Sequence, residues 1–365
     1  MSESKVDRRD YLKAVGAGIA GLVIGGVVGY ISKPAGIVEK TTTVTETVPT
    51  TVTTTIEKAV PVKKPYEGYH IIVITGDESD PFTTPIHKGA KDAEEHFGAK
   101  VDVFFSKGWR DEEFLKNFRT AVSLAPDGIA VCPLGSIETW DHEIAEAYKK
   151  GIIVTFQNVD IPEIREKYYE CGYIGQELYT AGCNLAKAAL KKYKFNPGDL
   201  VAVFSGAWGE PARAQRAYGV YDTLKDAGLK VDKVEHPPEV YADPMRGVEY
   251  VVGYISAHPD VKLIVFDGGG TTSATDAYMK AAGKKPGEII CAGFDLTPGA
   301  IRSIKEGYLQ LTLDQQPYLY GYLTTLNILL TKKIKIMGLY IDTGGGIVDE
   351  TNVEEIEELS KQGYR

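Results

Sequence analysis

Hydrophobic residues occur along most of the chain in short runs that alternate with longer, helix-like stretches of mixed character. After Tyr69 the apolar runs include IIVIT, GIAVC, GIIVTF, LVAVF and KLIVF, and they show no polar alternation. Strands that are covered on both faces have this continuous pattern. Strands that alternate with helices of ten to fifteen residues indicate βαβ units and a parallel sheet. The pattern therefore predicts an α/β protein.

The order of the runs predicts two α/β units of about a hundred residues each. The first has expected strands at 69–75, 100–105, 128–133 and 151–156 and expected helices at about 85–97, 112–125 and 141–150. The second has expected helices at 178–192, 212–227, 247–258 and 273–282 and expected strands at 200–206, 229–235, 262–269 and 288–295. A further helix (298–306), strand (309–316) and helix (318–332) exceed what either unit needs, so we expect the chain to cross back into the first unit.

The first thirty residues form a separate segment with a charged start and an apolar or glycine run from Ala14 to Tyr30, which is 17 residues long. That length is at the lower edge of what spans a bilayer and exceeds most signal-peptide cores. The preceding DRRDYLK resembles the twin-arginine export signal, although Asp7 stands where Ser or Thr is usual and Tyr11 where Phe is more common. We expect residues 1–30 to direct export. No cysteine follows the run, which excludes a lipoprotein anchor, and the segment is either cleaved or kept as the membrane anchor.

Gly16, Gly18 and Gly21 within this run spell GxGxxG. A dinucleotide-binding turn must follow a strand and open a helix. Small residues in a membrane segment explain these glycines better. Residues 31–66, rich in threonine and punctuated by proline, cannot bury enough apolar surface to offset their ordering entropy, so we expect a disordered stalk.

Composition narrows the function of the rest. The chain has 365 residues, 43% hydrophobic and 25% charged, with a formal charge of −9, which argues against nucleic acid as a partner. The four cysteines stand too far apart for a CxxC pair and have no histidines at metal-ligand spacing, so neither a metal nor a cofactor is predicted. Cys132 and Cys291 are expected to be buried, and pairing of Cys171 with Cys183 stays open.

Polar and aromatic residues follow the predicted strands. Ligands of open α/β sheets bind beyond the carboxyl ends of strands, so these positions are the candidate site. They are Asp77–Phe82, Phe156–Asn158, Gly206–Gly209 with Arg216 on the next helix, Asp267–Gly270, Asp295 and Asp314–Gln316.

Several of these segments resemble the type I periplasmic sugar-binding proteins, the ribose-binding group of extracellular receptors for ABC importers. The segments are SDPFTTPIHKGAKDAEEHFG, CGYIGQELYTAG, WGEPARAQRAYGV, AGFDLTPGAIRSIKEGYLQLTLDQQP and DTGGGIVDETNV, and the resemblance extends over 69–353. It implies two doubly wound parallel-sheet lobes joined by a hinge of crossing strands. The N-lobe would comprise 67–173 plus about 316–345, and the C-lobe 174–315 plus about 346–365.

Carried over position by position, the resemblance implies a set of ligand-binding residues. Asp80 and Phe82 take the place of a polar residue and a sugar-stacking aromatic. Gln157 and Asn158 depart from the family's acidic residue and arginine, which leaves that wall neutral and puts ribose in doubt. The remaining candidates are Trp208, Arg216, Tyr241, Asp267, Asp295 and Gln315.

Each candidate has a structural alternative. Asp295 could cap the helix near Pro298, Arg216 could be a solvated helix charge, and Trp208 could pack at the lobe edge. Trp109 and Trp140 are weaker candidates still. The glycines after Asp267 lack the Lys-Ser/Thr of a P-loop, so they favour a tight turn. The DTG triplet at 342–344 has no second copy, so an aspartic protease is not indicated.

The residues and the resemblance together predict a non-catalytic, monomeric receptor that captures a monosaccharide or polyol. It would deliver this ligand to the permease and ATPase of an ABC importer from the cell surface or periplasm. A ligand-sensing ectodomain and a glycosidase using two of Asp80, Asp267 and Asp295 are the alternatives. The low content of Asn and Gln, 13 in all, with the export signal and stalk, suggests a thermophilic archaeal source.

Overall fold

The computed structural model describes residues 63–209, 214–241 and 243–365. Contacts divide the chain into 1–67 and a compact unit of 68–365, and the description below concerns the second. The expected signal or anchor at 1–30, and the expected stalk at 31–66 apart from its last four residues, lie outside the described residues. Among the residues that are described, no helix has the length and apolar character to cross a membrane.

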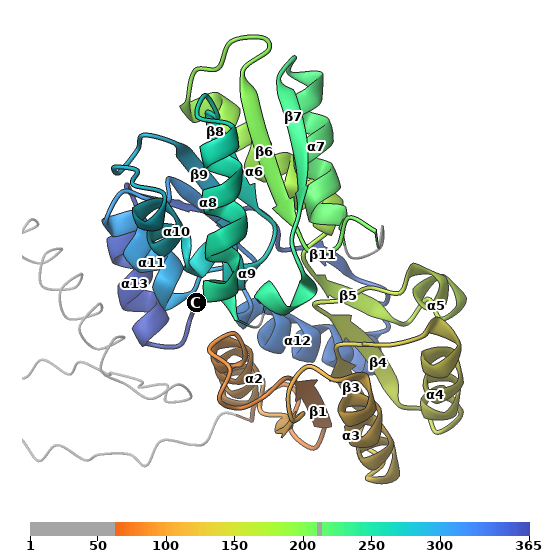
Figure 1. Ribbon diagram of the computed structural model, residues 1–365. Coiled ribbons are helices and arrows are strands. Elements are labelled where there is room, and N and C mark those ends of the chain that lie inside the picture. The colour runs from red at the N-terminus through yellow and green to blue at the C-terminus, as the bar shows by residue number, and fades with distance from the viewer. Residues whose placement is uncertain (1–62, 210–213, 242) are drawn as a thin grey trace, which may run out of the picture. The chain divides into compact units, whose positions relative to one another are not determined.

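The N-lobe is built on a six-stranded parallel sheet (Figure 1). Its strands, in spatial order, are β11 (Tyr340–Asp342), β5 (Gly172–Gly175), β4 (Ile153–Gln157), β3 (Gly128–Val131), β1 (His70–Thr75) and β2 (Lys100–Phe105). One face is covered by α3 (Asp111–Ser123), α4 (Ile137–Lys149) and α5 (Pro162–Lys167), and the other by α2 (Thr83–Phe97) and α12 (Tyr318–Ile334). Phe114, Phe118 and Trp140 are fully buried under the first face.

The C-lobe repeats this plan on a second sheet of six strands. Their order is β12 (Gly346–Asp349), β10 (Leu311–Asp314), β9 (Ile290–Phe294), β8 (Leu263–Phe266), β6 (Leu200–Ser205) and β7 (Lys230–Glu235). One face carries α6 (Leu178–Lys192) and α7 (Gln215–Asp226). The other carries α8 (Val248–Ala257), α9 (Gly269–Ser273), α10 (Thr275–Ala281), α11 (Pro298–Lys305) and α13 (Val353–Lys361), preceded by the 3-10 turns η1 (Pro238–Tyr241) and η2 (Pro244–Gly247).

Helices on both faces of both sheets confirm the predicted doubly wound α/β class. One pairing differs from the expectation of purely parallel lobes, because β12 runs antiparallel to β10. The apolar runs at the centre of each sheet are buried along their whole length, as the absence of polar alternation predicts.

The chain passes between the two sheets three times, from β5 to α6, from β10 to α12 and from β11 to β12. Side chains join these crossings. Asp342 Oδ1 accepts hydrogen bonds from the N–H groups of Glu177 (3.0 Å) and Gly344 (2.8 Å). Gln316 Nε2 donates to the carbonyl oxygen of Thr343 at 2.9 Å. The crossings therefore form one hydrogen-bonded hinge, and after the second crossing α12 packs on the sheet of the N-lobe.

Several short elements do not appear in the sequence pattern. They are α5, α13, β5, β11 and β12, and the strands among them have only three or four residues each. Such runs are too short for periodicity to separate strand from loop. The helix expected at 273–282 corresponds to α10. It is preceded by the short α9, which the sequence pattern does not predict, with Ala274 between them at φ −100° and ψ 9°.

Candidate functional site

Asp295 and Gln315 follow two neighbouring strands of the C-lobe, β9 and β10, and lie against each other. Gln315 Nε2 donates to Asp295 Oδ1 at 2.6 Å, and Gln315 Oε1 accepts from the hydroxyl of Tyr320 at 3.1 Å. Asp295 has a left-handed backbone, φ 70°. It does not cap the next helix, because the N-cap is Thr297, whose Oγ1 accepts from the N–H of Ala300 at 3.1 Å. The capping alternative for Asp295 is therefore wrong.

Arg216, at the start of α7, completes this cluster. Its Nη1 lies 3.8 Å from Asp295 Oδ2, and its Nε donates to Gln176 Oε1 at 2.5 Å. The guanidinium also stacks over the ring of Phe294, 5.2 Å from its centroid. The side chain is only 14% exposed, so Arg216 is not a solvated helix charge. Its position joins the C-lobe to the first crossing, where Gln176 lies.

Asp267 follows β8 and is buried under Tyr241. The Tyr241 hydroxyl lies 2.9 and 3.0 Å from the two carboxylate oxygens and accepts from the N–H of Gly206 at 2.8 Å. Burial raises the pKa of Asp267, although hydrogen bonds from Ser205 and Tyr241 partly counter it. Tyr241 also explains the glycine at 268, since a Cβ there would lie 2.9 Å from the tyrosine ring. The tyrosine occupies the space that a side chain at 268 would need.

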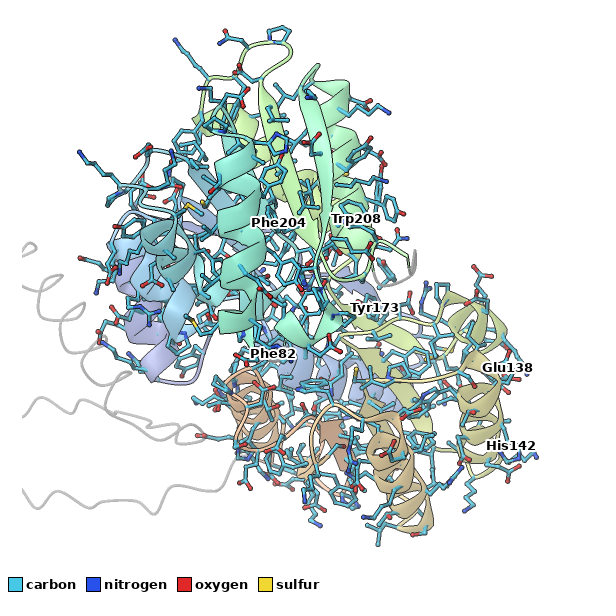
Figure 2. The ribbon with its side chains drawn as sticks, viewed as in Figure 1. Phe82, Glu138, His142, Tyr173, Phe204 and Trp208 are labelled. Atoms are coloured by element: carbon cyan, nitrogen blue, oxygen red, sulfur yellow. The ribbon has the colours of Figure 1, made fainter. Side chains whose placement is uncertain are left out.

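On the N-lobe, Asp80 and Phe82 belong to an aromatic cluster. Asp80 Oδ2 accepts from the indole N–H of Trp109 at 2.6 Å, and Oδ1 accepts from the N–H of Phe82 at 2.9 Å. The Phe82 ring meets Trp109 and Tyr320 edge-on, with centroids 5.6 and 6.1 Å away. Figure 2 shows Phe82 at the edge of the N-lobe that faces the C-lobe. Trp109, which sequence reasoning set aside, thus positions both predicted residues.

Gln157 and Asn158 end β4 and are held within the N-lobe. Gln157 is 1% exposed, and its Nε2 donates to the carbonyl oxygen of Ile74 at 2.8 Å. Its Oε1 is buried and has no hydrogen-bond partner among the described residues. Asn158 has φ 63°, and its N–H donates to Ile174 at 3.4 Å. Neither residue is among those that line the hollow between the lobes described below.

Trp208 lies in a different environment from the other candidates. Its indole N–H donates to the carbonyl oxygen of Val234 at 3.2 Å, and its ring meets that of Tyr218 edge-on at 5.2 Å. Lys233 Nζ lies 4.7 Å from the Trp208 ring centroid and is also close to Tyr218 and Tyr221. Figure 2 places Trp208 beside β7 and α7. These contacts favour the packing alternative for Trp208.

A hollow of about 10 Å³ between the lobes collects residues from both. It is lined by Pro81, Phe82, Pro85, Asp295, Leu296, Asp314, Gln315, Pro317 and Arg365. Three predicted residues, Phe82, Asp295 and Gln315, thus share one space. Asp314, which the strand-end rule also marks, lies with them, and Arg365 is the additional residue. The sequence pattern carries no signal for Arg365, because it follows no predicted strand.

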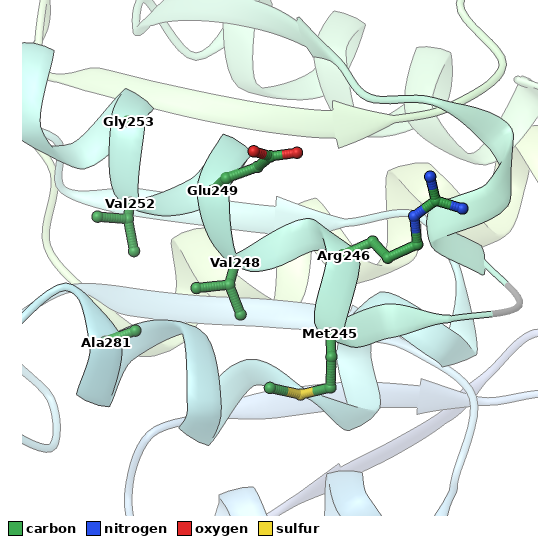
Figure 3. Close-up of a pocket in the computed structure, with 7 residues that line it drawn as sticks. All are labelled: Met245, Arg246, Val248, Glu249, Val252, Gly253 and Ala281. Atoms are coloured by element: carbon green, nitrogen blue, oxygen red, sulfur yellow. The ribbon is translucent and has the colours of Figure 1, made fainter.

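A second hollow, of about 630 Å³, lies on the surface of the C-lobe beside η2, α8 and α10 (Figure 3). Met245, Arg246, Val248, Glu249, Val252, Gly253 and Ala281 line it, and none of them follows a strand of the sheet. Because it is remote from the strand ends and has no candidate residue, we place the site in the hollow between the lobes.

The four cysteines are all free, and Cys132, Cys171 and Cys291 are buried. Cys171 and Cys183 therefore do not pair, while the expected burial of Cys132 and Cys291 is confirmed. Burial raises the pKa of all three buried thiols, so none of them is a reactive thiolate.

Comparison with known proteins agrees with this architecture. Residues 71–329 match the family model described as a periplasmic binding protein domain. The xylose/arabinose-binding protein XylF of Sulfolobus acidocaldarius is 28% identical over 298 residues, which cover 78% of this chain and 72% of that protein. The D-allose-binding periplasmic protein of Escherichia coli is 24% identical over 243 residues, 66% of this chain and 76% of that protein.

Solved structures show the same fold. A periplasmic ribose ABC transporter protein from Conexibacter woesei superposes with a TM-score of 0.70 at 19% identity, covering 82% of this chain and 98% of that one. A solute-binding protein from Burkholderia graminis, in complex with D-arabinose, gives a TM-score of 0.67 at 24% identity and covers 80% and 98% of the two chains.

Proposed function

Because the chain belongs to the periplasmic binding protein domain family, we propose that it captures a small sugar or polyol between its lobes and delivers it to an ABC importer. The observation that carries this proposal is the pair of Asp295 and Gln315 at the carboxyl ends of two C-lobe strands, which shares the interlobe hollow with Phe82. Arg216 of α7 lies beside the Asp295 carboxylate. Strand ends are where open α/β sheets bind ligands.

The chemistry of these side chains suits a sugar. Each hydroxyl both donates and accepts, so it can donate to the Asp295 carboxylate and accept from Arg216 or Gln315. The Phe82 ring can cover an apolar C–H face. Among the described residues, Gln157 Oε1, Gln176 Nε2 and Thr343 Oγ1 are buried without a partner. A bound hydroxyl would satisfy such atoms, and an analogue that lacks it would leave them unpaired.

The names of the relatives guide the choice of ligand. XylF is named for xylose and arabinose and the Escherichia coli protein for D-allose, all of them neutral aldoses. The neutral wall at Gln157 and Asn158 fits the same class. We therefore infer that this chain takes a neutral aldopentose, aldohexose or polyol, as a binding protein rather than an enzyme.

We propose that residues 1–66 direct this activity to the outer side of the membrane. We propose that residues 1–30 act as a twin-arginine-like signal, cleaved or retained as an anchor, and that residues 31–66 form the stalk of a monomeric surface receptor of archaeal origin. Replacing Arg8 and Arg9 together by lysine should stop export. The measurement is the fraction of the protein that reaches the external side of the membrane. Lys5→Arg is the matched control, and continued export of the double variant would reject the signal.

The ligand test uses the full chain in mild detergent with D-xylose, L-arabinose, D-ribose, D-allose, D-glucose and myo-inositol. A ligand at about 100 times its dissociation constant stabilises the fold by about 2.7 kcal/mol, a shift of several degrees in thermal unfolding. We expect one sugar to give this shift and to be recovered unchanged. The absence of a shift with all six would reject the proposal for these ligands, and a chemically altered sugar would favour the glycosidase.

Delivery to an importer needs its own test. The sugar-loaded chain should raise the ATPase rate of the cognate permease–ATPase complex in proteoliposomes, whereas the sugar alone should not. A loaded chain without effect there would favour the ligand-sensing ectodomain.

A further inference from the structure

The segment that follows α13, Gly363–Arg365, leaves the C-lobe helix and reaches the interlobe hollow. Arg365 Nη1 lies 3.0 Å from Asp314 Oδ2 and donates to Gln316 Oε1 at 3.3 Å. Asp314 ends β10, and its side chain is only 3% exposed. A buried carboxylate needs a charged or hydrogen-bonded partner, and Arg365 supplies it. The guanidinium is therefore held at the strand end beside the second crossing.

The same segment also contacts the N-lobe. The ring of Tyr364 packs on Tyr318 of α12, with centroids 5.4 Å apart, and Lys88 Nζ of α2 lies 4.6 Å over that ring. Lys88 is fixed in turn by Asp92, at 2.7 and 2.9 Å. Gly363 has φ +81°, a conformation that glycine adopts without strain. The turn at Gly363 thus sends Tyr364 to the N-lobe and leaves Arg365 directed at the C-lobe strand ends.

Arg365 retains donors for a ligand. Within the described part of the chain, both of its side-chain hydrogen bonds leave from Nη1. Nε and Nη2 carry three further N–H groups, and the side chain is 26% exposed. Arg365 lines the same hollow as Phe82 and Asp295.

We propose that Arg365 is a ligand-binding residue of this site, which donates from Nε or Nη2 to a hydroxyl oxygen of the bound sugar; this rests on the proposed function. Asp314 and Gln316 act as positioning residues, since they hold the guanidinium by Nη1. Arg216 lies 3.8 Å from Asp295, and Arg365 lines the same hollow as Asp295 and Gln315, so the site has two guanidinium groups. Such an arrangement selects sugars with adjacent hydroxyls that can accept from both.

The test compares the full wild-type chain with Arg365→Ala and Arg365→Lys. Lys361→Ala, on the exposed face of α13 where Lys361 pairs with Glu358 at 2.6 Å, is the matched control. Calorimetric titration is made with D-xylose, L-arabinose, D-ribose and D-allose, and then with the monodeoxy analogues of the tightest binder. Loss of a hydrogen bond to a charged group predicts a weakening of about tenfold or more for Arg365→Ala, and Lys361→Ala should stay within about twofold.

The analogues separate contact from structural support. If Arg365 contacts one hydroxyl, the wild type binds one monodeoxy analogue about tenfold more weakly than the parent sugar, and Arg365→Ala binds the two alike. Arg365→Lys keeps a cation beside Asp314, so it should unfold at the wild-type temperature. If Arg365→Ala does not fold, Arg365→Lys takes its place in the titrations, and it should likewise bind the parent sugar and the monodeoxy analogue alike. Unchanged affinity, or an equal weakening for the parent and every analogue, would overturn the proposal. A wild type that binds none of the four sugars, and neither D-glucose nor myo-inositol, would instead reject the proposed function, and this inference with it.

Discussion

The side-chain amide of Gln315 donates a hydrogen bond of 2.6 Å to Oδ1 of Asp295, joining the ends of two adjacent strands. Oδ2 of the same carboxylate faces Arg216 at 3.8 Å, and a Cβ at Gly269 would lie only 2.7 Å from it. Asp295 is therefore oriented from three sides before a ligand arrives. Preorganised polar groups bind with less loss of side-chain entropy.

Asp295→Asn should weaken sugar binding by about tenfold or more, because a hydrogen bond to a charged acceptor contributes about 1.5–3 kcal/mol. The amide keeps the shape of the carboxyl but removes the charge that faces Arg216. Calorimetric titration with the sugar found above measures the effect. Asp226→Asn, at an exposed position near the end of α7, is the control and should bind as the wild type does. Equal affinities for the two variants would remove Asp295 from the site.

Trp109 should report ligand binding by its fluorescence. Its indole N–H is bonded to Asp80 and its ring meets Phe82 edge-on, so a sugar that covers Phe82 changes its surroundings. Of the three tryptophans, Trp140 is fully buried in the N-lobe. Trp109→Phe should lose most of the sugar-dependent change in emission, whereas Trp140→Phe and Trp208→Phe should keep it. A change that survives in Trp109→Phe and disappears in Trp208→Phe would return Trp208 to the site.

The sequence predicts the strand ends well because parallel sheets impose a simple rule. Asp295 and Gln315 follow buried apolar runs, and the rule brings such positions to one edge. The hinge follows from a surplus of elements after the second unit. These predictions need only local pattern and topology.

Local pattern and topology do not predict side-chain contacts between segments that are distant in the sequence. Trp109 follows β2 and Asp80 follows β1, and the two side chains form a hydrogen bond. The Trp109 ring also packs against Gly76, and neither contact can be predicted from the local sequence pattern. Arg365 reaches Asp314 across 51 residues. Trp208 shows the opposite case, since its contacts with Lys233 of β7 and Tyr218 of α7 depend on how that strand and helix pack against each other.

Asp267→Asn should stabilise the ligand-free chain at pH 7 while it weakens sugar binding. The pKa of Asp267 is raised by burial, so the native carboxyl binds its proton at a higher pH than the unfolded chain does, whose pKa is about 3.9. Stability is therefore lost as the pH rises above about 3.9 toward the native pKa, and none of it is lost below about pH 3.9. We expect the thermal midpoint of Asp267→Asn to exceed that of the wild type at pH 7 and to equal it at about pH 3.5.

If the thermal midpoint of Asp267→Asn lies below that of the wild type at both pH values, Asp267 serves the fold rather than the ligand. Asp226→Asn is again the matched control, since its carboxyl is exposed.

Asp276 predicts a pH dependence of the reverse sign in the same lobe. Burial would raise its pKa, but hydrogen bonds from Arg302, Lys280 and Ser303, at 3.1 Å each, outweigh burial and lower the pKa from 3.8 to about 2. A carboxyl whose native pKa is lowered stabilises the fold at pH values above the unfolded pKa of about 3.9, and this contribution is lost as the pH falls toward 2.

Because Arg302 and Lys280 are about half exposed, screening limits the contribution of Asp276 to about 1 kcal/mol. Asp276→Asn should therefore unfold about 2–4 °C below the wild type at pH 7, with the gap closing between about pH 4 and pH 2. Thermal unfolding in this range measures it, and a gap that persists at pH 2 would show that the carboxylate charge is not its source.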